Sequence, residues 1–149
     1  MDVSGTISAI LAQKGSDVYS ISPDATVFQA IEMMDAKNVG ALLVTRAGEP
    51  VGIISERDYT RKVFLRGKHS RETRVSEIMS SNLTVTGPEE PVEKCLRMMT
   101  ERHIRHLPVL ENEKLVGLIS IGDLVKHVIS CQSATIAHLE NYIHGGGYS

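Results

Sequence analysis

Apolar residues in the first third of the chain recur at the spacing of a helix that is buried along one face. Four of them lie at positions i, i+3, i+4 and i+7, namely Val27, Ala30, Ile31 and Met34. An α-helix places such positions on a single side. A mostly apolar run follows at 39–44, and its length fits a buried strand. The pattern therefore predicts a helix followed by a strand.

Further elements flank this helix and strand. A second apolar run at 51–55 follows a predicted turn at 48–50, which contains glycine and proline. A second helix is expected to begin near residue 56. Ahead of the first helix, residues 18–21 have the pattern of a short leading strand that a proline ends. The predicted series is strand, helix, strand, strand, helix.

The whole series occurs a second time, 65 positions further along the chain. Under that offset residues 27–58 align with 92–123 without a gap, and Pro23 falls on Pro88. Upstream of the second proline the alignment slips, and Gly87 has the position of a one-residue insertion. The period exceeds the roughly 20–50 residues of solenoid repeats, so two copies indicate a duplicated half-domain. Identical pairs include Val27 and Val92, Met33 and Met98, Met34 and Met99, Leu42 and Leu107, Gly52 and Gly117, Ile54 and Ile119, Ser55 and Ser120, and Asp58 and Asp123.

We expect neither copy to be stable alone, because a chain of about 60 residues buries too little of its surface. Two β-α-β-β-α copies that pack through their sheets with pseudo-two-fold symmetry would bury one shared core. That arrangement leaves two equivalent clefts where the copies meet, which are common positions for ligands. The predicted fold class is α+β.

Segments outside the copies complete the predicted organisation. Residues 4–14 and 134–143 have amphipathic patterns that favour short flanking helices, and the glycine-rich tail at 144–149 is expected to be disordered. The expected boundaries are an N-terminal helix at 1–15, the first repeat at 16–68, a linker with the second repeat at 69–130, and a C-terminal helix with the tail at 131–149.

Composition narrows the class of protein. Aromatic residues make up only 4% of the chain and tryptophan is absent, so the core is expected to be aliphatic. The net charge of −2 argues against general binding of nucleic acid and against a polybasic membrane anchor. Cys95 and Cys131 lack metal-ligand spacing, and no apolar run approaches the roughly 18 residues of a membrane span. We expect a cytoplasmic protein with no metal.

The most informative chemical motif is Ser-x-x-Asp, which occurs where each second strand meets its helix, at Ser55 and Asp58 and again at Ser120 and Asp123. One interpretation is a capping box, in which the serine caps the helix and the acid bonds back to it. The other is a binding site for a sugar, because a carboxylate has two acceptor oxygens that suit a vicinal diol. Both can hold together.

A helix, a strand pair and Gly-x-x-Ser-x-x-Asp, in two copies, resemble the tandem CBS (cystathionine-β-synthase-type) repeat pair, or Bateman module. The matching stretches are VGIISERDYTRKV and HIRHLPVLENEKLVGLISIGDLVKHV, and the resemblance covers roughly residues 17–129. It implies binding of an adenine nucleotide such as AMP, ATP or NAD(H) in the clefts. It also implies that Asp58 and Asp123, with Ser55 and Ser120, hold the ribose, and that two modules pair into a homodimeric four-repeat disk.

Phosphate contacts are expected at two basic clusters. Arg57 lies in the first turn of a predicted helix, where the helix dipole disfavours a cation unless an anion arrives, and Arg61 follows at i+4. Its segment 56–74 has seven Lys or Arg against three Asp or Glu, whereas the equivalent of Arg57 in the second copy is Gly122. By resemblance, Arg105 and His106 also hold phosphate. Solvated basic side chains are the alternative interpretation for both clusters.

The adenine ring is expected, by resemblance, on the leading strands and the starts of the following strands. In the first copy these residues are Ser20, Ile21, Ser22, Val39, Gly40 and Ala41, and in the second they are Thr84, Val85, Thr86 and Ile104. The small pair at 40 and 41 leaves space for a base or a second ribose. The slipped alignment around Gly87 makes the second set the weaker prediction.

Three functions compete. The first is a regulatory sensor that binds an adenosine-containing molecule and acts on an unidentified effector protein. The second is a constitutive structural module whose clefts stay empty. The third is a small hydrolase that uses His103, His106, Glu101 and Asp123, but the helical spacing of metal-ligating histidines is absent. We therefore expect no catalytic residues.

Overall fold

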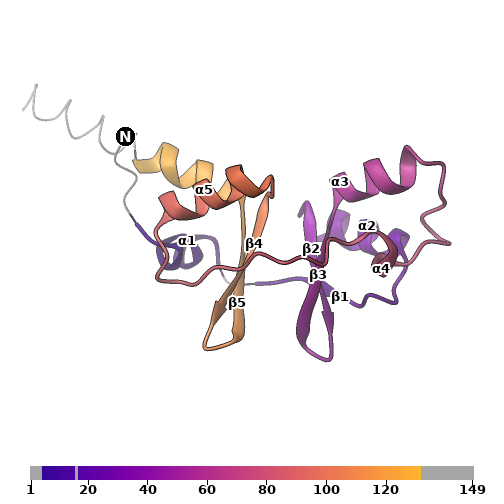
Figure 1. Ribbon diagram of the computed structural model, residues 1–149, viewed down its shortest axis with the longest axis horizontal. Coiled ribbons are helices and arrows are strands. Elements are labelled where there is room, and N and C mark those ends of the chain that lie inside the picture. The colour runs from indigo at the N-terminus through magenta and orange to yellow at the C-terminus, as the bar shows by residue number, and fades with distance from the viewer. Residues whose placement is uncertain (1–4, 16, 132–149) are drawn as a thin grey trace, which may run out of the picture. The chain divides into compact units, whose positions relative to one another are not determined.

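The computed structural model describes residues 5–15 and 17–131 (Figure 1). By their contacts these residues form two compact units, of which one contains 17–85 and 108–118 and the other contains 5–15, 86–107 and 119–131. The predicted trailing helix at 134–143 and the tail at 144–149 lie outside the described residues.

The predicted duplication is confirmed, because helices and strands recur at positions shifted by 65 residues. β2 and β3 pair antiparallel, β4 and β5 form a second sheet, and each pair is a hairpin in Figure 1. The protein is therefore a mixed α and β fold built from two repeats. The matching elements are α2 (Val27–Lys37) and α5 (Val92–Arg102), β2 (Ala41–Arg46) and β4 (His106–Glu111), and β3 (Glu49–Ser55) and β5 (Lys114–Ser120).

The apolar faces of both first helices are buried, as the spacing predicts. α2 buries Val27, Ala30 and Met34, and α5 buries their equivalents Val92, Cys95 and Met99. Each helix ends where the next residue takes the left-handed conformation, with φ of 54° at Asn38 and also at His103. Asparagine tolerates this conformation well, whereas His103 adopts it with an ordinary side chain. Because the two helices end at equivalent residues, the strands that follow them also begin at equivalent residues of the two repeats.

The leading strand forms in the first repeat and not in the second. β1 (Ser20–Ile21) pairs in parallel with β2, with Ser20 opposite Leu43. The predicted equivalent at 83–86 is wrong, since no strand of the described residues covers it. Thr86 is instead buried, and its hydroxyl lies 3.3 Å from the thiol sulfur of Cys95. Of the predicted segment only Thr86 makes a β-bridge.

Both hairpins turn through two residues with positive φ. The turn residues are Ala47 and Gly48, with φ of 53° and 81°, and Asn112 and Glu113, with φ of 51° and 66°. A turn of this kind matches the twist of the flanking strands and favours Asn-Gly. The predicted turn at 48–50 shares only Gly48 with the observed turn, because β3 already begins at Glu49.

A short helix from outside the strand and helix series docks on each repeat. α4 (Val75–Ile78) docks on the start of α2: Val75 N–H donates to the carbonyl of Ala25 at 2.8 Å, and Val27 N–H donates to that of Thr73 at 2.8 Å. Val75 and Ile78 are buried in the core around α2.

α1 (Ile7–Lys14) makes the equivalent contacts with the second repeat. Ile7 N–H donates to the carbonyl of Glu90 at 3.0 Å, and Val92 N–H donates to that of Gly5 at 3.2 Å. Ile7 and Ile10 are buried, as their counterparts on α4 are. Each repeat is thus completed by a helix that lies outside its own strand and helix series.

A close approach of the chain explains the glycine that begins the Gly-x-x-Ser-x-x-Asp motif. Ile53 and Ser80 exchange two backbone hydrogen bonds of 2.9 Å, which holds the segment after α4 against β3. A Cβ at Gly52 would lie 2.7 Å from the sulfur of Met79 and 3.0 Å from the carbonyl oxygen of Ser80. Glycine is therefore required there by packing.

The second helix of the first repeat begins at the predicted residue. α3 (Glu56–Tyr59) continues into a π-helical turn, η1 (Thr60–Phe64). In the second repeat, helical backbone at 121–131 follows β5.

The duplicated turns allow a reciprocal stability test. Ala47→Asn is expected to raise the free energy of unfolding by about 1 kcal/mol, because asparagine accepts positive φ more readily than alanine. Asn112→Ala is expected to lower it by a similar amount. Urea denaturation of both variants measures these changes. If both substitutions shift the free energy of unfolding in the same direction, the turn assignment is contradicted.

Candidate functional site

The two Ser-x-x-Asp motifs form the same capped helix start in both repeats, which confirms the capping interpretation. In the first, Ser55 N–H donates to Asp58 Oδ2 at 2.9 Å, and Asp58 N–H donates to Ser55 Oγ at 3.2 Å. In the second, the equivalent bonds between Ser120 and Asp123 are 2.8 and 3.1 Å. Each pair of hydrogen bonds fixes the acid at the helix start, with one carboxylate oxygen engaged by the backbone.

Each capped turn is also joined to the start of the preceding hairpin. Glu56 N–H donates to the carbonyl of Gly40 at 3.0 Å, and Ile121 N–H donates to that of Arg105 at 2.8 Å. These bonds bring the first-repeat acid near Gly40 and the second-repeat acid near Arg105. Gly40 and Arg105, two of the predicted ligand residues, therefore lie against the capped helix starts.

A lysine contacts each acid, and the two lysines come from different elements. Lys62, on η1, lies with Nζ 3.2 Å from Asp58 Oδ1, and it also donates to the carbonyl of Ile78 at 2.8 Å. Lys14, the last residue of α1, lies with Nζ 2.7 Å from Asp123 Oδ2. Sequence reasoning missed Lys14, because the contact spans 109 positions and lies outside the repeat that gave the motif.

The electrostatics of Asp123 reflect this lysine. Burial on its own would raise the pKa of Asp123, but the hydrogen bonds from Lys14 and from the backbone and side chain of Ser120 outweigh it, and the pKa is lowered from its ordinary 3.8. Asp123 is therefore an ionised, half-buried carboxylate at neutral pH. Such a group is a strong acceptor for hydroxyl or ammonium donors.

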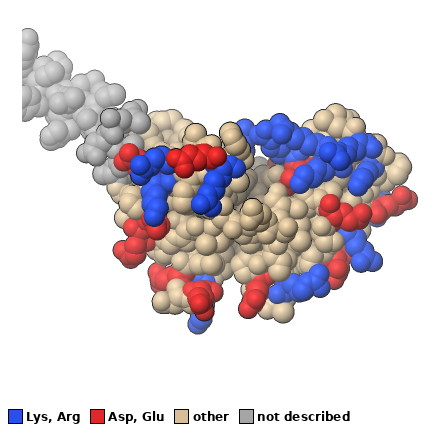
Figure 2. Space-filling view, viewed as in Figure 1, with Lys and Arg blue, Asp and Glu red and all other residues tan. Residues whose placement is uncertain are grey.

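The predicted phosphate residues are accessible. Arg57, Arg61 and Arg105 are exposed, and His106 is half-buried at the start of β4. Lys and Arg side chains gather over α3 and the segment that follows it (Figure 2). The first repeat thus presents a cationic surface beside Asp58, whereas the lysine in contact with Asp123 comes from α1.

The predicted adenine residues divide by burial. Exposed or half-buried positions can meet a ligand, and these are Ser20, Ile21, Ser22, Val39, Gly40, Thr84, Val85 and Ile104. Ala41 and Thr86 are buried, with exposed fractions of 5% and 7%. These two positions are therefore poor candidates for direct contact with a ligand.

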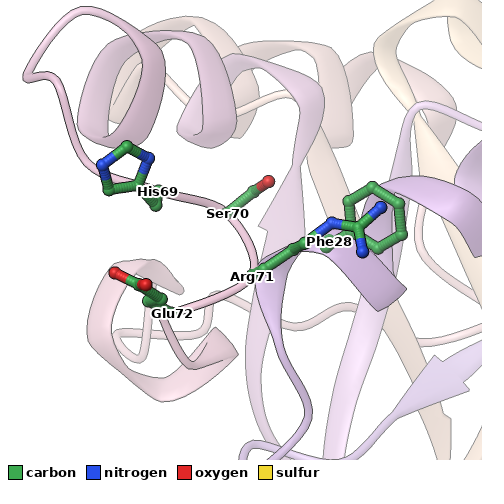
Figure 3. Close-up of a pocket in the computed structure, with 5 residues that line it drawn as sticks. All are labelled: Phe28, His69, Ser70, Arg71 and Glu72. Atoms are coloured by element: carbon green, nitrogen blue, oxygen red, sulfur yellow. The ribbon is translucent and has the colours of Figure 1, made fainter.

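A surface pocket that the sequence did not indicate lies on the first repeat. It is lined by Phe28, His69, Ser70, Arg71 and Glu72. Figure 3 shows Arg71 against the ring of Phe28, with the guanidinium carbon 4.0 Å from the ring centroid, and His69 and Glu72 on the other side of the loop. None of the predicted ligand residues lines this pocket.

Residues 5–15 and 17–131 contain no cluster of three or more His, Cys, Asp or Glu side chains that could hold a metal ion. No helix there is long and apolar enough to cross a membrane.

Comparison with known proteins identifies relatives along most of the chain. A model of the CBS domain family matches residues 11–64 and 75–130. The chain is 39% identical over 153 residues to CBS domain-containing protein CBSX3, mitochondrial, of Arabidopsis thaliana, with 96% of this chain and 74% of that protein covered.

Solved structures share the fold. A protein with CBS domains from Burkholderia ambifaria MC40-6 superposes with a TM-score of 0.83 at 45% identity, covering 86% of this chain and 96% of that one. The CBS domain pair of protein MJ0100, solved with 5′-methylthioadenosine and S-adenosyl-L-methionine, superposes with a TM-score of 0.75 at 21% identity, covering 86% and 98%. At that identity the second comparison shows the fold alone.

Asp123 should make stability depend on pH. Asp123→Asn is expected to lower the free energy of unfolding by about 1 kcal/mol at neutral pH, because the carboxylate accepts charge-assisted hydrogen bonds. Folding lowers its pKa, so its contribution is complete above the ordinary 3.8 and is lost as the pH falls through the folded-state pKa. Chemical denaturation across a pH series measures this. A difference between variant and wild type that stays constant into acid would contradict the assignment.

Proposed function

The chain belongs to the CBS domain family, and we propose that it is a regulatory module that binds an adenosine-containing ligand at its two Ser-x-x-Asp turns. The observation that carries the proposal is the repeated placement of an acid at a capped helix start, with Asp58 and Asp123 each half-buried beside a cation. The adenosine ligands of the MJ0100 pair support the choice of ligand class.

The ribose is assigned to the acids. A half-buried carboxylate presents acceptor oxygens to a vicinal diol, and the capping bonds from Ser55 and Ser120 hold Asp58 and Asp123 in place before ligand arrives. Because the acids are already positioned, binding loses little side-chain entropy.

The phosphate is assigned to the exposed cations. In the first repeat these are Arg57 and Arg61, and in the second they are Arg105 and His106, whose backbone is joined to the Ser120 turn through the carbonyl of Arg105. Unequal cations predict unequal affinities of the two sites for phosphate-bearing ligands such as AMP, ATP or NAD(H). The adenine ring is assigned to the exposed and half-buried positions near β1 and near residues 39–40 and 104.

The output is proposed to be regulatory rather than catalytic. A ligand shifts function only when it binds two arrangements of the module with different affinity, and the response passes to a partner protein. We place this action in the cytoplasm, because Cys95 is a buried thiol and thiols persist in a reducing compartment.

A homodimer is proposed as the assembled form, with contacts at two equivalent apolar positions. Phe64 and Ile129, which lie 65 positions apart in the second helical segment of each repeat, expose 66% and 57% of their surface. Large apolar side chains exposed at matching positions favour an interface between copies.

The second candidate is a structural module that binds no nucleotide. The observation that favours it is that Asp58 and Asp123 already have cations at 3.2 and 2.7 Å. In that case both lysines serve only to neutralise the acids, and the assembled form is independent of nucleotide.

Ligand binding is tested by thermal denaturation with AMP, ATP, NADH or S-adenosylmethionine at millimolar concentration. At least one should raise Tm, since a ligand that binds only the folded state stabilises it by mass action. The double variant Asp58→Ala and Asp123→Ala should lose the rise. Glu113→Ala, an exposed acid in a hairpin turn, is the control and should keep it. A wild type whose Tm ignores all four compounds would favour the structural module.

The dimer is tested by size-exclusion chromatography with light scattering. Phe64→Glu combined with Ile129→Glu should convert a dimer to a monomer, because two buried charges at an interface are costly. Ala36→Glu, which places a charge at an exposed position of α2, should leave the mass unchanged. A dimer that survives the double change would place the interface elsewhere.

A further inference from the structure

A lysine joins each acid to the short helix that docks on its repeat, and the two repeats build this connection in different ways. In the first, Lys62 contacts Asp58 at 3.2 Å and the last carbonyl of α4, that of Ile78, at 2.8 Å. In the second, Lys14 at the end of α1 contacts Asp123 directly at 2.7 Å. The equivalent of Lys62 is His127, so the second connection is built from a non-equivalent position.

The contact at Asp123 uses an oxygen that a sugar would need. Oδ2 accepts both the N–H of Ser120 at 2.8 Å and the ammonium of Lys14 at 2.7 Å. A carboxylate oxygen has about two acceptor positions, so these bonds fill Oδ2. A vicinal diol that bonds to both carboxylate oxygens must therefore take the position of Lys14, since the backbone N–H of Ser120 is fixed by the helix start.

Lys14 can leave without undocking α1. The helix is held at its other end by Ile7 and Ile10, with exposed fractions of 0% and 4%, and by the backbone bonds from Ile7 to Glu90 and from Ser8 to Pro88. The side chain of Lys14 is 34% exposed, and the helix ends at Gly15, the next residue. Only the end of the helix that carries the lysine has to move.

We propose, on the basis of the function proposed above, that Lys14 is an internal competitor of the ligand at the second turn. Lys14 occupies the acceptor oxygen of Asp123 in the unliganded protein, and the ribose diol of an adenosine-containing ligand displaces it. Occupancy of the second turn is thereby coupled to the end of α1, whereas the first turn is coupled to α4 through Lys62. The two turns differ in which oxygen the lysine contacts: Lys14 shares Oδ2 of Asp123 with the N–H of Ser120, whereas Lys62 contacts Oδ1 of Asp58, the oxygen that the N–H of Ser55 leaves open.

The test is calorimetric titration of adenosine and of AMP into the full chain carrying Asp58→Ala, which leaves the second turn as the site measured. Lys14→Met in that background should tighten adenosine binding about fivefold, the size expected for removal of a partly exposed ion pair. Lys14→Gln should act in the same direction. Lys94→Met is the matched control. It removes the ion pair that Lys94, on α5, makes with Glu90, and it should leave the affinity for adenosine unchanged. Circular dichroism confirms that each variant is folded.

The possible results are separable. Unchanged or weaker adenosine binding in both Lys14 variants overturns the inference about Lys14. The proposed function is not affected by that result as long as the wild type binds adenosine. Weaker AMP binding with unchanged adenosine binding also overturns it, because Lys14 would then be a phosphate contact. Absence of adenosine and AMP binding in the wild type and every variant overturns the proposed function at these turns, and the inference with it.

Discussion

The reciprocal hydrogen bonds between a serine and an acid at the start of a helix determine the chemistry of this protein. They satisfy backbone N–H groups that a helix leaves unpaired. In doing so they hold a carboxylate half-buried at the end of β3 in one repeat and of β5 in the other. The same bonds therefore stabilise the helix and position the acid. A motif that looks purely structural is for this reason also the candidate site.

Duplication produces two such acids, and the differences between the repeats give them different surroundings. Arg57 has Gly122 as its counterpart, and Lys62 has His127. The second repeat receives its cation from α1 instead. Two acids of equal backbone geometry thus differ in electrostatics, and that difference is the physical basis for assigning them unequal ligand affinities.

The short helices α1 and α4 connect the two acids to other parts of the chain. Each docks on the start of a repeat's first helix by paired backbone bonds and buried aliphatic side chains. Each is also connected through a lysine to the acid of the repeat on which it docks. Each carboxylate is thus in contact, through one lysine, with a helix from outside its repeat's strand and helix series, and the proposed regulatory role relies on these contacts.

The sequence by itself determined the repeat, its first helices and hairpins and the two capped acids, because periodicity of 3.6 and 2 residues and cap chemistry are local properties. The same local reasoning put the first turn at 48–50 instead of at Ala47 and Gly48, since alanine gives no signal for positive φ. It also predicted a leading strand at 83–86, where the structure has a β-bridge at Thr86 alone. Only the tertiary structure decided that Lys14 lies against Asp123 and that α1 completes the second repeat as α4 completes the first. Those contacts join segments far apart in the chain, and the spacing of residues along the sequence does not indicate which distant residue the end of a docked helix will contact.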